Sequence, residues 1–282
     1  MKPVVRKLLT GVLLAVFLGS SAMFLYHLYA KDQSGDSYRE AADIAGLAAE
    51  PIHVPETVPK KMGTEPVQTE PAVTEPPEIH WIPAPIPEED SYLTELAGTD
   101  LDALRQHSDD VIGWIRIPGT KVNYPIVQGE DNQYYLEHLW NGSANPTGAI
   151  FLESTQEPAM DCFYSILYGH NNIDRSMFGS LHYYESQQYY EAYPYVYLVT
   201  DSGAFRYDIY AAHTVEVDSI IYAVELSREE TKEQLIRETL RDSEIETGII
   251  PAVTDRILTL STCDGNYDVR WVVHARLRMI QE

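Results

Sequence analysis

Cysteine is scarce in this chain, and the short motifs of common metal sites are missing. The 282 residues contain two cysteines, Cys162 and Cys263, and neither HExxH nor CxxC occurs. No acidic cluster has the spacing expected of a calcium site. We therefore expect no metal and no other cofactor.

Positive charge is also in short supply. Lysine and arginine number 20 against 43 acidic residues, which gives a net charge of −23. Residues 1–98 and 99–282 are both acidic, so no basic part is hidden in the average. This charge argues against broad basic patches for nucleic acid, and solubility is a sufficient reason for most of it.

Charged residues are absent from Leu8 to Ala30. An apolar helix of this length can cross a bilayer, and the preceding Lys2, Arg6 and Lys7 place the N-terminus in the cytoplasm. A cleaved signal peptide is the alternative, because Ser20-Ser21-Ala22 resembles a cleavage site. We favour an uncleaved anchor over residues 1–30, since the apolar run continues beyond that site and ends with tyrosines suited to a membrane interface.

Proline is concentrated in one part of the chain. Ten of the seventeen prolines lie between Pro51 and Pro87, around an imperfect Thr-Glu-Pro repeat. Such a segment cannot bury a core, so residues 31–98 are predicted to be a disordered tether that lifts the domain off the membrane. A short helix over Ser37–Ala49 is the exception within it. Residues 99–282 form the predicted catalytic domain, and we expect a chain starting near residue 90 to fold.

Helical periodicity precedes a series of short strands. Leu93, Leu96, Leu101 and Leu104 have the spacing of N-terminal helices that pack on a domain. From Val111 onward short strands dominate, which predicts a mainly β fold with a closed or nearly closed barrel. A capping-box match at Ser227–Glu230 predicts a helix before the last two strands.

The C-terminal hairpin carries the most informative residues. Cys263 stands at the end of a predicted apolar strand. Asp264-Gly265-Asn266 are residues typical of a tight turn, and Arg270 lies on the strand predicted to follow it. A guanidinium beside a thiol favours the thiolate and can bind an oxyanion. The missing base is a histidine, and His170 ends another apolar strand at Tyr168-Gly169-His170.

Of the nine histidines, His274 is the main rival to His170, because it shares a strand face with Arg270. It lies four residues further along, about 13 Å away, which is too far to meet the same atom. A disulfide between Cys162 and Cys263 is the alternative to two free thiols. Cys162 lies eight residues before His170 on one predicted strand, about 25 Å away, whereas a disulfide needs Cα atoms within about 7 Å. We therefore expect a reactive Cys263 and a packed Cys162.

These motifs together resemble the sortases. Thr259-Leu-Ser-Thr-Cys263 with Arg270, and Leu167-Tyr-Gly-His170, are similar to the family's catalytic motifs. Met177-Phe-Gly-Ser-Leu181 and Gly113–Gly119 followed by Asn123–Gln128 resemble class B in particular. The resemblance covers roughly residues 100–280 and implies a sortase barrel with N-terminal helices and a helix inserted between late strands.

The resemblance also implies roles for single residues. His170, Cys263 and Arg270 would be catalytic, with the arginine in place of a carboxylate as the third member. Asn132, Leu136 and Tyr168 would line the groove for a sorting signal, together with Ser261 and Thr262 before the cysteine.

The implied function is that of a membrane-anchored class B cysteine transpeptidase outside the cell. It would cleave a sorting signal of secreted proteins, similar to NPxTN or LPxTG, after threonine. The acyl group would pass to an amine of a peptidoglycan precursor or to a pilin lysine. Two alternatives stay open: a Cys–His wall hydrolase, and an inactive tethered barrel that acts as a binding module.

Overall fold

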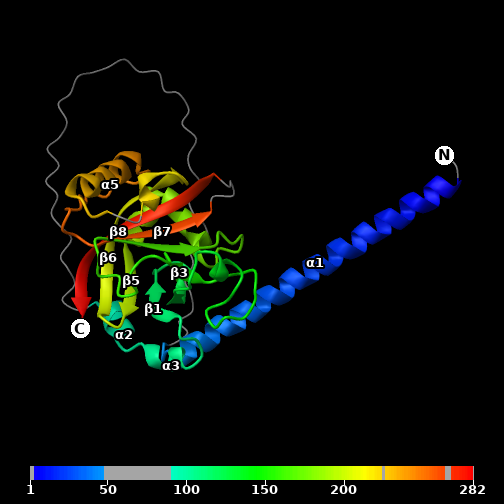
Figure 1. Cartoon of the computed structure of the whole chain (residues 1–282), viewed down its shortest axis with the longest axis horizontal. Coiled ribbons are helices and arrows are strands. Elements are labelled where there is room, and N and C mark those ends of the chain that lie inside the picture. The colour runs from blue at the N-terminus through cyan, green and yellow to red at the C-terminus, as the bar shows by residue number, and fades with distance from the viewer. Residues whose placement is uncertain (1–2, 48–89, 224–225, 264–267, 282) are drawn as a thin grey trace, which may run out of the picture.

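Eight strands form a closed barrel in this protein (Figure 1). The computed structural model describes residues 3–47, 90–223, 226–263 and 268–281, with the backbone alone for residues 3–9 and Cys263. Around the barrel the strand order is β1-β2-β3-β4-β7-β8-β6-β5, and β5 pairs with β1 to close it. The strands are β1 Val111–Arg116, β2 Asn123–Val127, β3 Ile150–Leu152, β4 Tyr164–Gly169, β5 Tyr195–Thr200, β6 Gly203–Glu216, β7 Ile257–Cys263 and β8 Val269–Gln281.

The helices lie before the barrel and between its strands. Helix α5 enters between β6 and β7, as the resemblance implied, and the short helices α2 and α3 precede β1. Asp90 and Asp100 cap α2 and α3, because each carboxylate accepts a hydrogen bond from the backbone N–H three residues later. The helices are α1 Pro3–Ile44, α2 Ser91–Leu96, α3 Leu101–Arg105, α4 Gln187–Ala192 and α5 Glu229–Asp242, with 3₁₀ turns η1 Tyr134–Leu136, η2 Phe178–Glu185 and η3 Ile220–Tyr222.

Alternate residues of the central strands enter two separate cores. Leu258 and Leu260 of β7 face the barrel interior, whereas Ile257 lies in a second cluster outside the barrel wall. That second cluster contains Leu235 and Ile236 of α5. Because helices or loops cover both faces, β4 and β7 are buried along almost their whole length, including the polar residues Ser165, Thr259 and Ser261.

The start of α5 differs from the prediction. The helix begins at Glu229 with Arg228 as its N-cap residue, and no side chain caps it. The capping box predicted at Ser227–Glu230 is therefore wrong. Glu229 and Glu230 instead place negative charge in the first turn, where the helix dipole favours it.

The part of α1 beyond the apolar run packs on the barrel (Figure 1). The Tyr38 hydroxyl donates a 2.7 Å hydrogen bond to the Gly148 carbonyl, and Trp140 Nε1 donates to Ser37. Residues 31–47 are thus ordered and joined to the domain, unlike the tether predicted from residue 31. Their small residues at helical spacing allow close approach, which outweighs the low hydrophobicity of the segment. The buried α1 side chains are Ala30, Ser34, Ser37, Tyr38, Ala41 and Ala42, followed by Ala45 and Leu47 after the helix ends.

The remaining tether residues, 48–89, lie outside the described residues. Leu93, Leu96, Leu101 and Leu104 are all buried in the same core as α1, so the predicted packing of these leucines is confirmed. The boundary of the domain at residue 99 stays a prediction, but the packed part of the chain includes residues on both sides of the segment 48–89.

This packing predicts the effect of N-terminal truncation. A chain starting at Lys31 should fold, whereas one starting at residue 90 should be less stable or aggregate, because it loses the buried face of α1. Within the longer chain, Tyr38→Ala should lower the free energy of unfolding by about 3 kcal/mol. Arg39→Ala is the matched control, since its side chain is 70% exposed and pairs with Asp36 at the surface. Urea unfolding measures both, and equal stabilities of the two variants would contradict the packing role.

Candidate active site

Two strand pairings bring the three predicted catalytic residues to one end of the barrel. Strands β4 and β7 run parallel with Gly169 opposite Thr262, so His170 and Cys263 each follow directly after a paired residue. Strand β8 runs antiparallel to β7 with Arg270 directly opposite Cys263. Residues that are far apart in the sequence therefore end beside one another.

A hydrogen bond fixes the ring of His170. Its Nε2 lies 2.7 Å from the Leu136 carbonyl, and because a carbonyl only accepts, Nε2 carries the proton. A Cβ added at Gly148 would lie 2.8 Å from His170 Cδ2 and 2.9 Å from the Leu136 oxygen. Gly148 also has φ of +65°, so glycine is needed there both for the backbone and for the approach of the ring.

Glycine is likewise required directly before the histidine. A Cβ at Gly169 would lie 2.5 Å from Ile150 Cδ1 and 2.9 Å from the Phe178 ring. The backbone N–H of Phe178 donates to the His170 carbonyl, so η2 closes over the end of β4. The Tyr168-Gly169-His170 motif therefore packs directly against the Met177–Leu181 motif.

Arg270 is half-buried at the start of β8. Its Nη1 donates a 2.8 Å hydrogen bond to the Val269 carbonyl. The positive charge lies near Tyr168 and opposes the rise in the pKa of that hydroxyl, which burial and Glu153 cause. Arg270 and Tyr168 therefore belong to the same electrostatic environment.

His274, the rival to His170, is buried and cannot meet a substrate. His274 is fully buried between strands, where its Nδ1 meets Thr259 Oγ1 at 2.8 Å and its Nε2 meets His213 Nε2 at 3.2 Å. Burial holds the pKa of His274 well below its usual value, so the ring is neutral. It is a core residue of β8.

Cys162 differs from the prediction in its surroundings. It precedes β4 rather than lying within it, and its thiol is free and exposed. Its Sγ donates to the Tyr164 carbonyl at 3.2 Å. Since Tyr164 pairs with Ile257 at the far end of β7, Cys162 lies at the opposite end of the strand pair from Cys263. The expectation of a free thiol is confirmed for Cys162, and the expectation of a packed one is wrong.

The predicted groove residues fall into two groups. Asn132, Leu136 and Tyr168 are half-buried, and Leu136 contacts His170, while Ser261 and Thr262 are 1% and 2% exposed. The Tyr222 hydroxyl lies 2.9 Å from Ser261 Oγ and covers it. The first group thus lies at the open side of the site and the second within the barrel wall.

Sequence reasoning missed Glu153, a buried carboxylate that joins two groove residues. Its Oε2 accepts hydrogen bonds from Asn132 Nδ2 at 2.7 Å and from the Tyr168 hydroxyl at 3.0 Å. Its Oε1 lies 3.3 Å from Thr155 Oγ1 and 3.4 Å from Ser154 Oγ. A charged residue directly after the apolar strand β3 was the available signal, because such a residue is rarely buried unless it is paired.

Comparison with known proteins agrees with this geometry. The sortase domain family model matches residues 115–278. Sortase B of Listeria monocytogenes serovar 1/2a (strain ATCC BAA-679 / EGD-e) is 31% identical over 196 residues, covering 67% of this chain and 79% of that protein. The chain belongs to the class B sortases. It is therefore a cysteine transpeptidase.

Solved structures share the barrel. The Staphylococcus aureus sortase B–substrate complex has a TM-score of 0.61 and 29% identity, over 64% of this chain and 85% of that one. A sortase B complexed with triglycine has a TM-score of 0.60 and 29% identity, over 64% of this chain and 86% of that one.

The contacts of Glu153 predict a measurable role. In Glu153→Gln, one side-chain oxygen is left to accept from Asn132 and Tyr168 on one side and from the Thr155 backbone N–H on the other, so at least one hydrogen bond is lost and the predicted groove loosens. We expect kcat/KM for a sorting-signal peptide to fall about tenfold, which corresponds to roughly 1.4 kcal/mol. Glu157→Gln is the control, because that residue is exposed four positions later. If both variants keep wild-type kinetics, Glu153 has no part in the groove.

Proposed function

We propose that Cys263 is the nucleophile that opens the sorting signal at its threonine carbonyl. The register that sets Arg270 opposite Cys263, with His170 following the neighbouring strand, carries this proposal. The thiolate adds to the carbonyl, and collapse of the tetrahedral intermediate releases an amine and leaves a thioester. A second amine then attacks the thioester, restores the thiol and forms a new amide.

His170 is proposed to move the protons. Because Nε2 is held by the Leu136 carbonyl, Nδ1 is the nitrogen left for proton exchange. It would protonate the leaving amine in the first half-reaction and deprotonate the incoming amine in the second.

Arg270 is proposed to stabilise the oxyanion and to favour the thiolate. Its guanidinium carries several donors in a planar fork, suited to an oxyanion and a substrate carbonyl together. Its position near Tyr168, beside the Glu153 cluster, supports a role at the substrate side of the site.

The groove is proposed to run over Asn132, Leu136 and Tyr168. Glu153 orients the first and third of these, and Leu136 orients His170 through its carbonyl. Ser261 and Thr262 are buried, so we assign them contact with substrate through the main chain rather than through their side chains.

The partners follow from the same reaction. We propose that the acyl donors are secreted proteins with a sorting signal similar to NPxTN or LPxTG. The acceptor is proposed to be an amine of a peptidoglycan precursor, with a pilin lysine as the alternative. The sortase B structures in complex with a substrate and with triglycine support an acyl donor and an amine as the two ligand classes.

We also propose that α1 anchors the enzyme with its N-terminus in the cytoplasm and the barrel outside. Among the described residues it is the one helix long and apolar enough to cross a membrane, and its apolar window is fully exposed. Lys2, Arg6 and Lys7 before the apolar run support this direction.

Transfer should exceed hydrolysis when an amine is supplied. With a sorting-signal peptide and triglycine, mass spectrometry should find the amide product, which a wall hydrolase would not form.

Cys263→Ala should abolish both cleavage and the thioester, whereas Cys162→Ala should keep most activity, because Cys162 lies at the far end of β4. Free acid as the sole product would favour the hydrolase, and activity of Cys263→Ala would remove the proposed nucleophile.

Arg270→Lys separates charge from donor geometry. Lysine keeps the positive field but cannot bind two oxygens with a planar fork. We expect the rate to fall at least about 10²- to 10³-fold with folding unchanged, as when one oxyanion donor is lost. Stopped assays on the donor peptide measure this effect, and near-wild-type kinetics would exclude the fork from the mechanism.

A further inference from the structure

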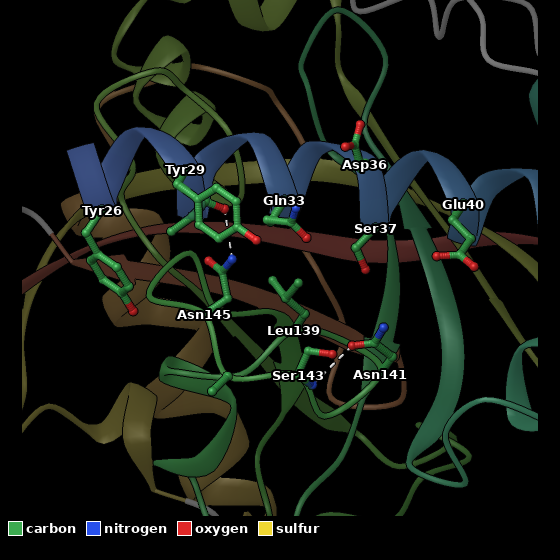
Figure 2. Close-up of a pocket in the computed structure, with 12 residues that line it drawn as sticks. Tyr26, Tyr29, Gln33, Asp36, Ser37, Glu40, Leu139, Asn141, Ser143 and Asn145 are labelled. Atoms are coloured by element: carbon green, nitrogen blue, oxygen red, sulfur yellow. Dashed lines mark hydrogen bonds between the residues drawn. The ribbon is translucent and has the colours of Figure 1, made fainter. Parts of the chain in front are cut away.

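The barrel is attached to α1 at the point where the apolar run ends. Asn145 Nδ2 donates a 2.8 Å hydrogen bond to the Ala30 carbonyl, as Figure 2 shows, and Lys31 Nζ lies 2.9 Å from Asp174 Oδ2. Helix α1 is continuous from Pro3 to Ile44, so no joint separates its apolar part from its docked part. The orientation of one therefore sets the orientation of the other.

These attachments leave little room between the barrel and a membrane. An α-helix rises 1.5 Å per residue, so Lys31 lies only about 1.5 Å along the axis beyond the last apolar residue. The loops that bind Ala30 and Lys31 must then lie at the level where the hydrocarbon ends. A domain lifted away on a long tether would not have these contacts.

The loop at Asp174 presents an apolar side chain at this level. Ile173 is fully exposed, at 101% of its reference area, directly beside the partner of Lys31. A fully exposed isoleucine gains free energy by leaving water for an acyl boundary. Tyr26 and Tyr29, 56% and 64% exposed on α1, have the amphipathic rings found at membrane interfaces.

Three cations lie in or against the loop that carries Ile173, although the chain as a whole is strongly acidic. Lys121 Nζ donates to the Asp174 carbonyl at 2.6 Å. Arg175 is exposed in the same loop and donates one hydrogen bond, from Nη1 to the Gly179 carbonyl at 2.9 Å. With Lys31, which pairs with Asp174, these make three cations against the single carboxylate of residues 171–176. Such a local excess of positive charge suits anionic headgroups.

A pocket between α1 and the loop around Asn145 crosses the same level (Figure 2). It has a volume of about 370 Å³, with Tyr26 and Tyr29 near one end and Asp36 and Glu40 toward the other. The tyrosines lie within the apolar run and the carboxylates beyond it. The pocket therefore changes from aromatic to acidic where a bilayer would give way to water.

We propose that the loop at residues 171–176 is a membrane-docking surface, with Ile173 inserted at the headgroup boundary and Lys31, Lys121 and Arg175 facing anionic phospholipid. The occupant is the outer leaflet of the bilayer that α1 spans, so the inference rests on the proposed anchoring. The barrel is seated on the membrane by a rigid helix, not held away from it.

This seating determines which end of the barrel faces the lipid. Ile173 follows β4 by four residues, and β4 runs parallel to β7, so the loop lies at the end that also carries Cys263. In Figure 1 β7 ends and β8 begins on the side of the barrel toward which α1 extends. The site thus opens close to the membrane surface, where an acceptor carried by a lipid would be within reach.

Quenching by brominated lipid tests the seating. Full-length Ile173→Trp and Ile250→Trp would be reconstituted in phosphatidylcholine/phosphatidylglycerol vesicles with and without bromine on the acyl chains. Ile250 is a matched control, being 74% exposed but placed before β7, at the opposite end of the strand pair. After subtraction of the wild-type signal, we expect at least about twofold quenching at 173 and none at 250. Equal quenching at both positions, or none at 173, would overturn the proposal.

Two further measurements separate seating from anchoring. Flotation of the protein with vesicles reports anchoring by α1, so failure to float would contradict the anchor itself. Flotation without quenching at 173 would overturn the seating alone. A flexible Gly-Ser linker inserted between Ala30 and Lys31 should keep flotation and lose the quenching, and undiminished quenching would show that helix continuity does not seat the barrel.

Discussion

The parallel pairing of β4 with β7 is the contact on which the site depends. It carries Gly169 to the level of Thr262, so that the next residue of each strand, His170 and Cys263, emerges at one edge. Parallel strands need a long crossover, and here the crossover contains two barrel strands and α5. A slip of one residue in this register would turn each following side chain to the other face.

The surroundings of the site are held by polar contacts rather than by the barrel core. The Leu136 carbonyl fixes His170, and Gly148 leaves room for that contact. Glu153 gathers the donors of Asn132 and Tyr168 in a buried position. A buried carboxylate is tolerable only because several hydrogen bonds replace its hydration. The result is that the residues of the proposed groove are oriented before a substrate arrives.

Helix α1 connects this groove to the proposed anchor. Tyr38 binds the carbonyl of Gly148, whose Cα approaches the His170 ring, while Lys31 binds the loop that follows His170. The helix thus contacts segments on both sides of the histidine. Since the helix of the proposed anchor is also part of the domain core, anchoring would restrict how the site can turn relative to the bilayer.

The sequence by itself determined the enzyme class and the class of fold, because the motifs around Cys263, Arg270 and His170 are local in the chain and stand at strand ends. Local periodicity in the sequence also predicted the short strands, the leucines before β1 and the helix before β7. Tertiary structure alone decided the rest. From the sequence, Glu153 looks like an ordinary surface carboxylate, but in the structure it is buried and accepts hydrogen bonds from Asn132 and Tyr168. Residues 31–47 likewise look like a polar spacer, but in the structure their small side chains pack on the barrel. The physical reason is that these contacts join segments far apart in the chain, and their free energy comes from partners that no sequence window contains.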